Sequence, residues 1–296
     1  MIGSLLVAAL EQACLFAPLG LGVLITFRFF RFPDLTAEGS YPLGGAVAAA
    51  LLVAGVHPVL CTLAAVAAGA GAGMVTGLLH TRLRINNIVS GIIVMTALYS
   101  VNLRVMGRPN VSLLSVDTVF ELFQGALRRA GLAASDAWAS IGLAAAVAGA
   151  LAAGLAWFMH TDLGLAVRAT GENETMIRSL GVDTSGTKLI GLAISNAAIA
   201  LSGALVAQSN GFSDIGMGIG ILVTGAAAVM LGEAFFGDGS IERWVLATLA
   251  GMLAYHVLVA TALRVGFGPT DLKLVTACLL LASLSLPRLR RRLAFR

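Results

Sequence analysis

The chain has 296 residues, of which 58% are hydrophobic and only 11% are charged, and its mean hydropathy is +0.93. Because a soluble domain carries roughly 25% charged residues, this composition excludes a water-soluble globular enzyme and predicts a polytopic membrane protein. The apolar stretches are continuous rather than alternating, which favours a helical bundle over a β-barrel. The formal net charge of +4 arises from cations at predicted helix ends, so we expect no nucleic-acid partner.

Charge-free stretches mark the predicted spans. A bilayer-spanning helix needs about 20 residues, so the uncharged stretch of 43 residues from 39 to 81 must hold two spans. They meet at His57-Pro58, because proline cannot continue the preceding helix and suits a new first turn. The sequence therefore predicts an all-α membrane bundle of about nine spans, at residues 5–27, 38–56, 58–80, 85–106, 137–159, 187–210, 215–235, 243–263 and 267–286.

Lysine and arginine positions predict the orientation. Placing the basic C-terminal tail inside the cell puts 13 of the 19 cationic side chains in the cytoplasm, as the positive-inside bias requires. We expect a multi-pass protein of the bacterial cytoplasmic (inner) membrane, surrounded by the lipid bilayer, with its N-terminus outside and its C-terminus inside. The first apolar run contains Glu11 and has no basic segment before it, which predicts a retained helix instead of a cleaved signal.

Two segments 180 residues apart resemble each other. Phe32-Pro33-Asp34-Leu35 matches Phe212-Ser213-Asp214-Ile215, and in the predicted topology one segment enters from the cytoplasmic side and the other from the outer side. Such inverted repeats are typical of transporters, although chance similarity in an Ala/Gly-rich sequence is the alternative. We divide the single transmembrane domain, 1–296, into repeat one (1–107), an outer loop (108–136), a central fifth span (137–159), a cytoplasmic loop (160–186), repeat two (187–287) and a basic cytoplasmic tail (288–296).

Polar side chains near the two helix-weakening segments are candidates for lining a pathway between spans two, four and seven. Acidic side chains in lipid are costly unless they are hydrated, paired or used as helix caps. For Asp34, Glu38 and Asp214, capping of the short helices is the alternative to lining a pathway. Tyr99 and Asn102 are expected either to contact the solute or to form hydrogen bonds between helices. The serines at heptad spacing on span six are expected either to permit close helix packing or to line the pathway. The pathway candidates are Asp34, Glu38, Ser40, Tyr99, Asn102, Ser202, Asp214 and Thr224.

Metal, disulfide and cofactor chemistry is not expected. Cys14, Cys61 and Cys278 lie in apolar stretches without metal-ligand spacing, so we interpret them as small core residues. No pair of histidines has ligand spacing, and only His256 is predicted to lie deep, as a hydrogen-bonded neutral imidazole or, alternatively, a proton relay.

Two polar loops are predicted to carry short helices. In the outer loop, apolar residues recur at helical spacing from Val116 to Leu127 and Gly131 follows as a stop, which predicts an amphipathic helix, either an interfacial anchor or part of a docking platform. The cytoplasmic loop predicts one or two helical turns over 163–169, a corner at 171–173 and a second short helix over 174–180 that ends at Gly181.

The second short helix of the cytoplasmic loop is too short to be stable alone. Met176, Ile177 and Leu180 share a face that we expect to pack against another protein or against the bundle. Arg168 and Arg178 are expected to pair with acids on a partner, or with Glu172 and Glu174 in the same loop.

Three stretches carry a resemblance to a known family. GLAVRATGENETMIRSLGV resembles the ATPase-coupling loop of the branched-chain amino acid, ribose and nucleoside permease class of ABC importers. LEQACLFAPLGLGVLITFRFFRFPDLTAEGSYPLGGAVAA is similar to the start of that class, particularly its poorly characterised members paired with a lipoprotein-like binding protein. GMGIGILVTGAAAVMLGEAFFG is similar to its second broken helix.

The resemblance implies a fold similar to the cobalamin importer permease without its first helix. It also implies two permease protomers, expected to be a homodimer or a pair with a paralogue, two cytoplasmic ABC ATPase subunits and an external substrate-binding protein. The residues it assigns to ATPase coupling are Leu163, Gly164, Arg168, Gly171, Asn173, Met176, Ile177, Arg178, Leu180 and Gly181.

The sequence thus predicts a transport subunit and not an enzyme, because it lacks the G-x-x-x-x-G-K-[ST] loop that cradles ATP phosphates. Amino acids, particularly branched or aromatic ones, are the first expected solutes, followed by nucleosides and sugars. The competing classes are an ion-coupled secondary transporter, with Asp34, Glu38 and Asp214 as ion sites, and a membrane scaffold that transports nothing.

Overall fold

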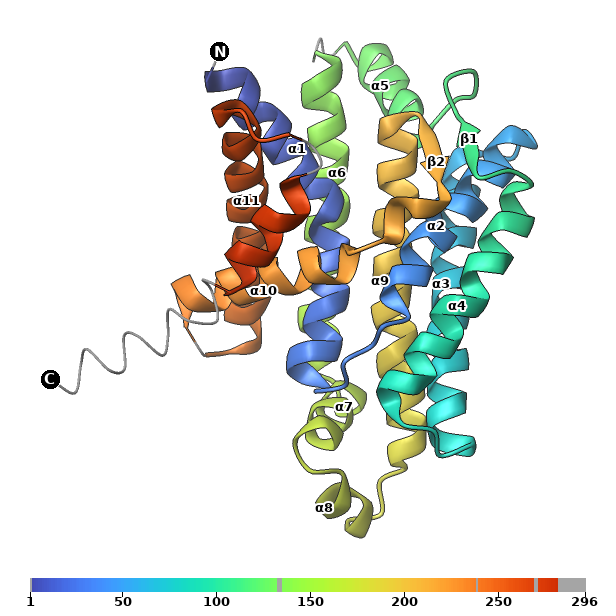
Figure 1. The fold of residues 1–296 in the computed structure, drawn as a ribbon, viewed down its shortest axis with the longest axis vertical. Helices are drawn as coiled ribbons and strands as arrows, with labels where there is room; N and C mark the ends of the chain where they lie inside the picture. Colours follow the sequence, from blue (N-terminus) through green and yellow to red (C-terminus); the bar gives the residue numbers. More distant parts are fainter. Residues whose placement is uncertain (1, 132–134, 238, 269–270, 282–296) are drawn as a thin grey trace, which may run out of the picture.

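The computed structural model describes residues 2–131, 135–237, 239–268 and 271–281, and its long helices run mostly along the longest axis of the molecule (Figure 1). The π-helical segment η1 continues α1, and the 3₁₀ segment η2 precedes α10. In chain order the elements are α1 (Ile2–Leu24), η1 (Ile25–Phe29), α2 (Ala37–Val53), α3 (Pro58–Arg82), α4 (Asn87–Met106), β1 (Asn110–Ser112), α5 (Val119–Arg129), α6 (Asp136–His160), α7 (Asp162–Glu172), α8 (Glu174–Ser179), α9 (Thr184–Asn210), β2 (Phe212–Asp214), η2 (Ile215–Gly218), α10 (Ile221–Phe236) and α11 (Ile241–Val265).

The helices confirm a polytopic helical protein but not nine spans. Seven described helices are long and apolar enough to cross a membrane, whereas the segments predicted as spans two and nine contain the shorter apolar helices Ala37–Val53 and Leu272–Leu281. The 17 residues of α2 reach about 25 Å, which is less than the roughly 30 Å hydrocarbon core. This helix ends early because Gly55 adopts the left-handed backbone conformation at φ 79°. The predicted basic tail at 288–296 lies outside the described residues.

Helix α9 is the central rod of the bundle, and it packs most extensively on α3 and α2 and also on α1. Glycines let the backbones touch: a Cβ at Gly44 would meet the backbone of Ala200, and a Cβ at Gly203 would meet the backbone of Tyr41. Such close approach replaces the hydrophobic driving force that lipid does not supply.

Two serines at heptad spacing on α9 bond α1. The Ser195 hydroxyl donates to the Gly22 carbonyl and the Ser202 hydroxyl to the Leu15 carbonyl, each at 2.8 Å. Both serines are fully buried. Of the two roles left open by the sequence, the structure therefore gives Ser202 the packing role.

The two predicted polar loops lie at opposite ends of the bundle. Helices α7 and α8 form one end, whereas α5 and the strand pair β1–β2 lie at the other, where the N-terminus also lies (Figure 1). The amphipathic helix predicted between spans four and five is confirmed as α5, which starts with a capping box between Thr118 and Glu121 and is followed by Gly131 at φ 76°. The antiparallel pairing of Val111 with Ser213 was not predicted.

The two similar segments share a local turn. The backbone N–H of Thr36 donates to Asp34 Oδ1 at 2.9 Å, and the N–H of Gly216 donates to Asp214 Oδ1 at 2.8 Å. The likeness does not extend to the helices that follow, since α2 runs along the long axis and α10 lies across it (Figure 1). Asp214 thus takes the capping role that the sequence left open, at the start of η2. Asp34 instead forms a turn before α2, because it bonds Thr36, the residue that precedes the first turn of that helix.

The three cysteines differ in burial. Cys61 is buried and Cys14 is half-buried, as expected for small packing residues, whereas Cys278 is exposed in the single chain. The prediction of a core position is therefore wrong for Cys278, because the surface of its short helix that bears this side chain faces away from the rest of the described chain.

The contact between α9 and α2 predicts a sharp difference between two glycines. Gly203→Val should lower the unfolding temperature of the purified protein by several degrees or prevent folding, since its side chain would overlap the Tyr41 backbone, and overpacking costs about 1–3 kcal/mol. Gly149→Val on α6 is the matched control, because nothing lies within 4 Å of a Cβ there. Equal thermal stability of the two variants would contradict the close packing.

Candidate functional site

The loop predicted to be cytoplasmic forms two consecutive helices, α7 and α8, joined at a single residue. Asn173 ends α7 and caps α8, with Oδ1 accepting from the Met176 N–H at 3.0 Å. The predicted corner at 171–173 is wrong for its first two residues, which are helical. Helix α7 continues through Gly171 because this glycine packs directly on the backbone of Phe29 and Phe30, where a side chain would not fit.

The predicted end of the second helix is confirmed. Gly181 has φ 85°, its N–H donates to the Arg178 carbonyl at 3.0 Å, and the Val182 N–H donates to the Ile177 carbonyl at 3.3 Å. This is a Schellman ending, which glycine permits because it has no Cβ.

The coupling candidates divide into residues that attach the loop and residues that project from it. Gly164 packs against the backbone of Phe158 and Met159. By contrast, the side chains of Leu163, Met176 and Leu180 are 54%, 57% and 67% exposed. No residue of α8 is buried, and of its apolar residues only Ile177 is half-buried, so the described part of the chain leaves most of this apolar face exposed.

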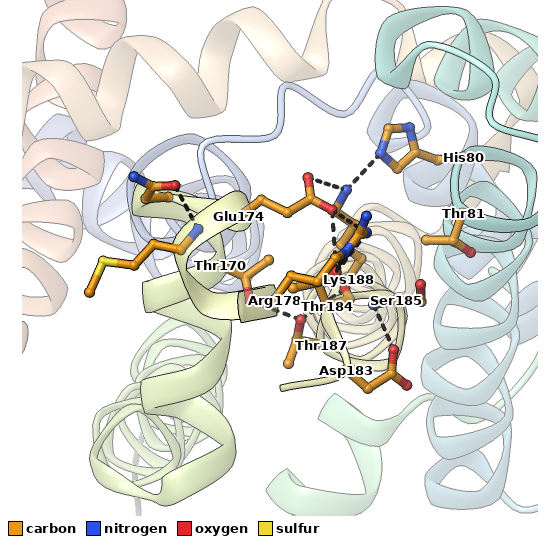
Figure 2. A network of polar contacts seen from close by, with 12 residues as sticks. His80, Thr81, Thr170, Glu174, Arg178, Asp183, Thr184, Ser185, Thr187 and Lys188 are labelled. Atoms are coloured by element: carbon orange, nitrogen blue, oxygen red, sulfur yellow. Dashed lines mark hydrogen bonds and ion pairs between the residues drawn. The ribbon is translucent and has the colours of Figure 1, made fainter. Parts of the chain in front are cut away.

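A buried lysine ties α8 to the ends of α3 and α9 (Figure 2). Lys188 Nζ donates to Glu174 Oε2 at 2.8 Å and lies 3.0 Å from His80 Nε2. His80 Nδ1 is 2.8 Å from the Ile85 carbonyl. Because a carbonyl only accepts, Nδ1 carries the proton and Nε2 accepts from the ammonium, so this histidine is neutral. We call the contacts of Lys188 with Glu174 and His80 the Lys188 clamp.

Glu174 holds two cations of the same chain. Arg178 donates to its Oε1 at 3.0 Å, in addition to the bond from Lys188. Burial raises the pKa of Glu174, but the hydrogen bond from Lys188 and the charges of Lys188 and Arg178 outweigh burial and lower the pKa below its ordinary 4.5. The carboxylate is therefore charged at neutral pH.

The two loop arginines behave differently. Arg178 takes the in-chain partner that the sequence left open, Glu174. Arg168 does not pair with Glu172, because Glu172 binds Arg31 at 2.9 Å. Arg168 instead lines a pocket beside α7 and α11.

A second cavity, of about 280 Å³, opens where predicted spans two, four and seven meet. Three of the eight pathway candidates line it, namely Glu38, Tyr99 and Asn102. Its walls come from α2, α4 and the segment around η2, and the full lining is Glu38, Gly39, Pro42, Met95, Thr96, Tyr99, Asn102, Ile215, Gly218 and Ile219.

The cavity offers hydrogen-bond acceptors in a largely apolar wall. Asn102 is 1% exposed; its Nδ2 donates to the Gly39 carbonyl at 3.2 Å, and its buried Oδ1 has no partner among the described residues. Glu38 Oε1 accepts from the Gly220 N–H at 3.2 Å. An unsatisfied buried acceptor costs about 1–3 kcal/mol, so this end of the cavity favours a ligand that donates hydrogen bonds.

The other five pathway candidates do not line this cavity. Asp34 is buried and accepts from Asn196 Nδ2 at 2.7 Å, while Ser40 donates to Asn196 Oδ1 at 2.7 Å. Thr224 lies 3.4 Å from the Tyr255 hydroxyl. Together with the packing of Ser202 and the capping by Asp214, these bonds give the five residues structural partners.

His256 lies deep, as predicted, but not as a hydrogen-bonded imidazole. Its ring packs against Phe16 and Tyr255, with ring centroids 4.9 and 5.2 Å away, and no described residue forms a hydrogen bond with its buried Nε2.

The Lys188 clamp generates a prediction for the attachment of α8. Lys188→Met should speed amide exchange in residues 174–180 about tenfold, since a hydrogen bond to a charged group is lost. Lys273→Met, which removes the exposed lysine of the helix Leu272–Leu281, is the control and should leave this segment unchanged. Hydrogen exchange measured by mass spectrometry compares the exchange rates of residues 174–180 in the two variants and the wild type.

The clamp also predicts a pH dependence. Because the pKa of Glu174 is lowered in the folded protein, its contribution is complete above about pH 4.5 and is lost as the pH falls below that value. Unaltered exchange of α8 in Lys188→Met, or protection of α8 that does not fall as the pH is lowered through the depressed pKa of Glu174, would contradict this role.

Comparison with known proteins places this geometry in a family. Residues 5–284 match the model described as "Branched-chain amino acid transport system / permease component". The chain is 39% identical over 280 residues to a tyrosine transport system permease protein of Clostridioides difficile, covering 95% of this chain and 90% of the relative. It is 32% identical over 286 residues to an uncharacterized protein of Rickettsia prowazekii, covering 95% and 97%.

More distant comparisons agree with a transport permease. The ribose import permease of Escherichia coli K12 is 27% identical over 224 residues, covering 74% of this chain and 66% of the relative. Among solved structures, PsaBC from Streptococcus pneumoniae in complex with Fab matches with a TM-score of 0.51 and 13% identity, covering 94% of this chain and 89% of that one. This likeness shows the fold alone, and the expected similarity to the cobalamin importer permease is not confirmed.

The matching family and the relative from Clostridioides difficile are transport permeases and not enzymes, and both match nearly the whole length of this chain. The chain belongs to the branched-chain amino acid transport system permease family and is a permease component of an ABC-type transport system.

Proposed function

We propose that this chain is the membrane-spanning subunit of an ATP-driven importer that carries an amino acid handed over by an external binding protein. The observation that carries the proposal is the helix pair α7–α8. A two-turn helix that is held to the bundle through Glu174 and Lys188, yet exposes Met176 and Leu180, is suited to receive force from another subunit.

Cytoplasmic ABC ATPase subunits are the proposed partners of this surface. ATP hydrolysis belongs to them, since the chain has no phosphate-binding loop of the P-loop type. In this arrangement α7 and α8 face the cytoplasm of a bacterial cell, the N-terminus lies outside, and α5 faces the external binding protein.

Two permease copies are proposed to enclose the pathway. Helix α4 leaves much of its apolar surface exposed in the single chain, including Ile88, Ile92 and Val101, and the cavity that holds Glu38 and Tyr99 lies beside it. The matching turns at Asp34 and Asp214 favour inverted halves, although the helices that follow them differ in direction, and rocking of such halves would alternate access.

An amino acid is the proposed solute because of the cavity and the relatives. Glu38 and the free Oδ1 of Asn102 suit an ammonium group, and Pro42, Met95 and Ile215 suit an apolar side chain. The relative from Clostridioides difficile is described as a tyrosine transport permease, whereas the ribose permease is more distant.

The coupling surface predicts a loss of transport. Met176→Asp or Leu180→Asp should reduce ATP-dependent uptake and co-purification of the ATPase at least tenfold, because each places an unpaired charge in an apolar contact. Thr175→Asp adds the same charge to another exposed position of α8 and is the control.

Proteoliposomes containing the permease, its ATPase and the binding protein provide the measurement. Full uptake in both α8 variants would contradict the coupling role. Uptake driven by an ion gradient without the ATPase would instead establish the ion-coupled alternative.

The cavity predicts a separate effect on the solute. Glu38→Gln should reduce amino acid uptake about tenfold, because a charge-assisted hydrogen bond to the ammonium becomes a neutral one. Asn102→Leu should act similarly, while Asp271→Asn, which alters an exposed acid that does not line the cavity, should not. Equal initial rates in all three variants, measured with labelled tyrosine and leucine, would remove the cavity from the pathway.

A further inference from the structure

We propose that the pocket between η1, α7 and α11 binds the phosphate of an anionic phospholipid head group. The pocket has a volume of about 320 Å³ and lies outside both the Lys188 clamp and the cavity at Glu38. Its lining is basic and aromatic, and consists of Arg28, Phe29, Arg31, Leu165, Arg168, Ala169, Glu172 and Trp244.

The charges around the pocket leave one positive charge without a counterion. Arg31 is matched by Glu172 at 2.9 Å, and Arg28 by Glu233 at 3.0 Å. The guanidinium of Arg168 is the third cation, and no ion pair to it is found among the described residues. A phosphodiester carries one negative charge, so it would neutralise this pocket.

Two buried donors of the pocket are unused. Arg168 Nε and Trp244 Nε1 are both buried, and neither has a hydrogen-bond partner in the part of the chain that the structure describes. Leaving a buried donor unpaired is costly, whereas an anionic oxygen accepts strongly from both guanidinium and indole N–H groups. The two donors therefore call for an anion that enters the pocket from outside the chain.

Neighbouring contacts hold these donors in place. The Arg28 guanidinium lies over the Trp244 ring, 4.8 Å from its centroid, and the Phe29 ring is 5.4 Å from that ring. Arg31 has φ 50°, a left-handed conformation that is unfavourable for a residue with a Cβ. That strain is stored where the chain turns beneath the pocket, as is common at binding sites.

The position of the pocket favours a lipid over a free anion. The candidate span Leu5–Phe29 ends here and the span Ile241–Val265 begins here, so the pocket lies at the boundary between apolar and polar surface, where tryptophan and arginine meet head groups. Leu165 in its wall is 55% exposed and Leu246 on α11 is 62% exposed, which gives acyl chains an apolar surface nearby.

The test measures lipid binding to the purified full-length chain in detergent without its ATPase, so its outcome is independent of the proposed function. Dioleoylphosphatidylglycerol and dioleoylphosphatidylcholine, which share acyl chains, are titrated and bound lipid is counted by native mass spectrometry. We expect the anionic lipid to bind at least tenfold more tightly than the zwitterionic one.

Variants separate this pocket from general attraction to a basic protein. Arg168→Gln should weaken binding of the anionic lipid about tenfold, and Trp244→Phe should weaken it about threefold. The affinity of Arg168→Lys should lie between those of the wild type and Arg168→Gln, because lysine keeps the charge but has no Nε. The control is Arg104→Gln, which alters an exposed arginine in the last turn of α4. This variant should bind the anionic lipid as tightly as the wild type does. Monodisperse elution in size-exclusion chromatography shows that each variant is folded.

Two results would overturn the proposal. The first is unchanged phosphatidylglycerol binding in both Arg168→Gln and Trp244→Phe. The second is equal binding of the two lipids by the wild type. A third arm adds inorganic phosphate: if millimolar phosphate displaces the lipid and alone raises the unfolding temperature of the wild type but not of Arg168→Gln, the site belongs to a free anion and the lipid assignment fails.

Discussion

The close backbone contact of α9 with α2 and α3 is the constraint on which the rest of the structure depends. In lipid, apolar side chains gain little by leaving their surroundings, so helices associate through small residues that bring backbones together. Gly44 and Gly203 serve α2, whereas Gly73 brings α3 against the backbone of Leu192. With no side chain between the backbones, α9 has almost no freedom to slide without moving its neighbours.

This rigid helix joins the two ends of the bundle. At one end Lys188 binds Glu174 of α8. At the other end Gln208 accepts from the Val119 N–H of α5 at 3.1 Å and donates to Thr62 at 3.0 Å. The surface proposed for the ATPase and the surface proposed for the binding protein are therefore held by polar side chains of one helix.

Local features of the sequence predicted local features of the fold. Charge-free runs located the long helices, Gly181 and Gly131 marked helix ends, and the Glu174–Arg178 pair follows from its spacing of four residues. Features that depend on residues distant in sequence were missed. Arg31 and Glu172 meet only after η1 packs on α7, and the unpaired Oδ1 of Asn102 exists only because Gly39 occupies its amide.

The polar residues illustrate why residue type alone does not define a pathway. Serines, threonines and acids were expected to line it, yet most of them satisfy partners between helices. Asp34 is the clearest case, because both carboxylate oxygens accept hydrogen bonds, from Thr36 and from Asn196. Glu38, in contrast, lines a cavity. The sequence offers no signal that distinguishes an acid bonded between helices from an acid that lines a cavity.

The same contacts connect the proposed coupling surface to the proposed solute cavity. A force on Met176 or Leu180 reaches Glu174 within the same short helix, and the Lys188 clamp passes it to α9. Since α9 and α2 touch through Gly44 and Gly203, α2 must follow, and α2 carries Glu38 and Gly39 in the cavity wall. Packed interfaces of this kind shift between discrete arrangements instead of deforming gradually. Closure of an ATPase pair would therefore change the cavity through one continuous line of contacts, without any charge having to cross the lipid.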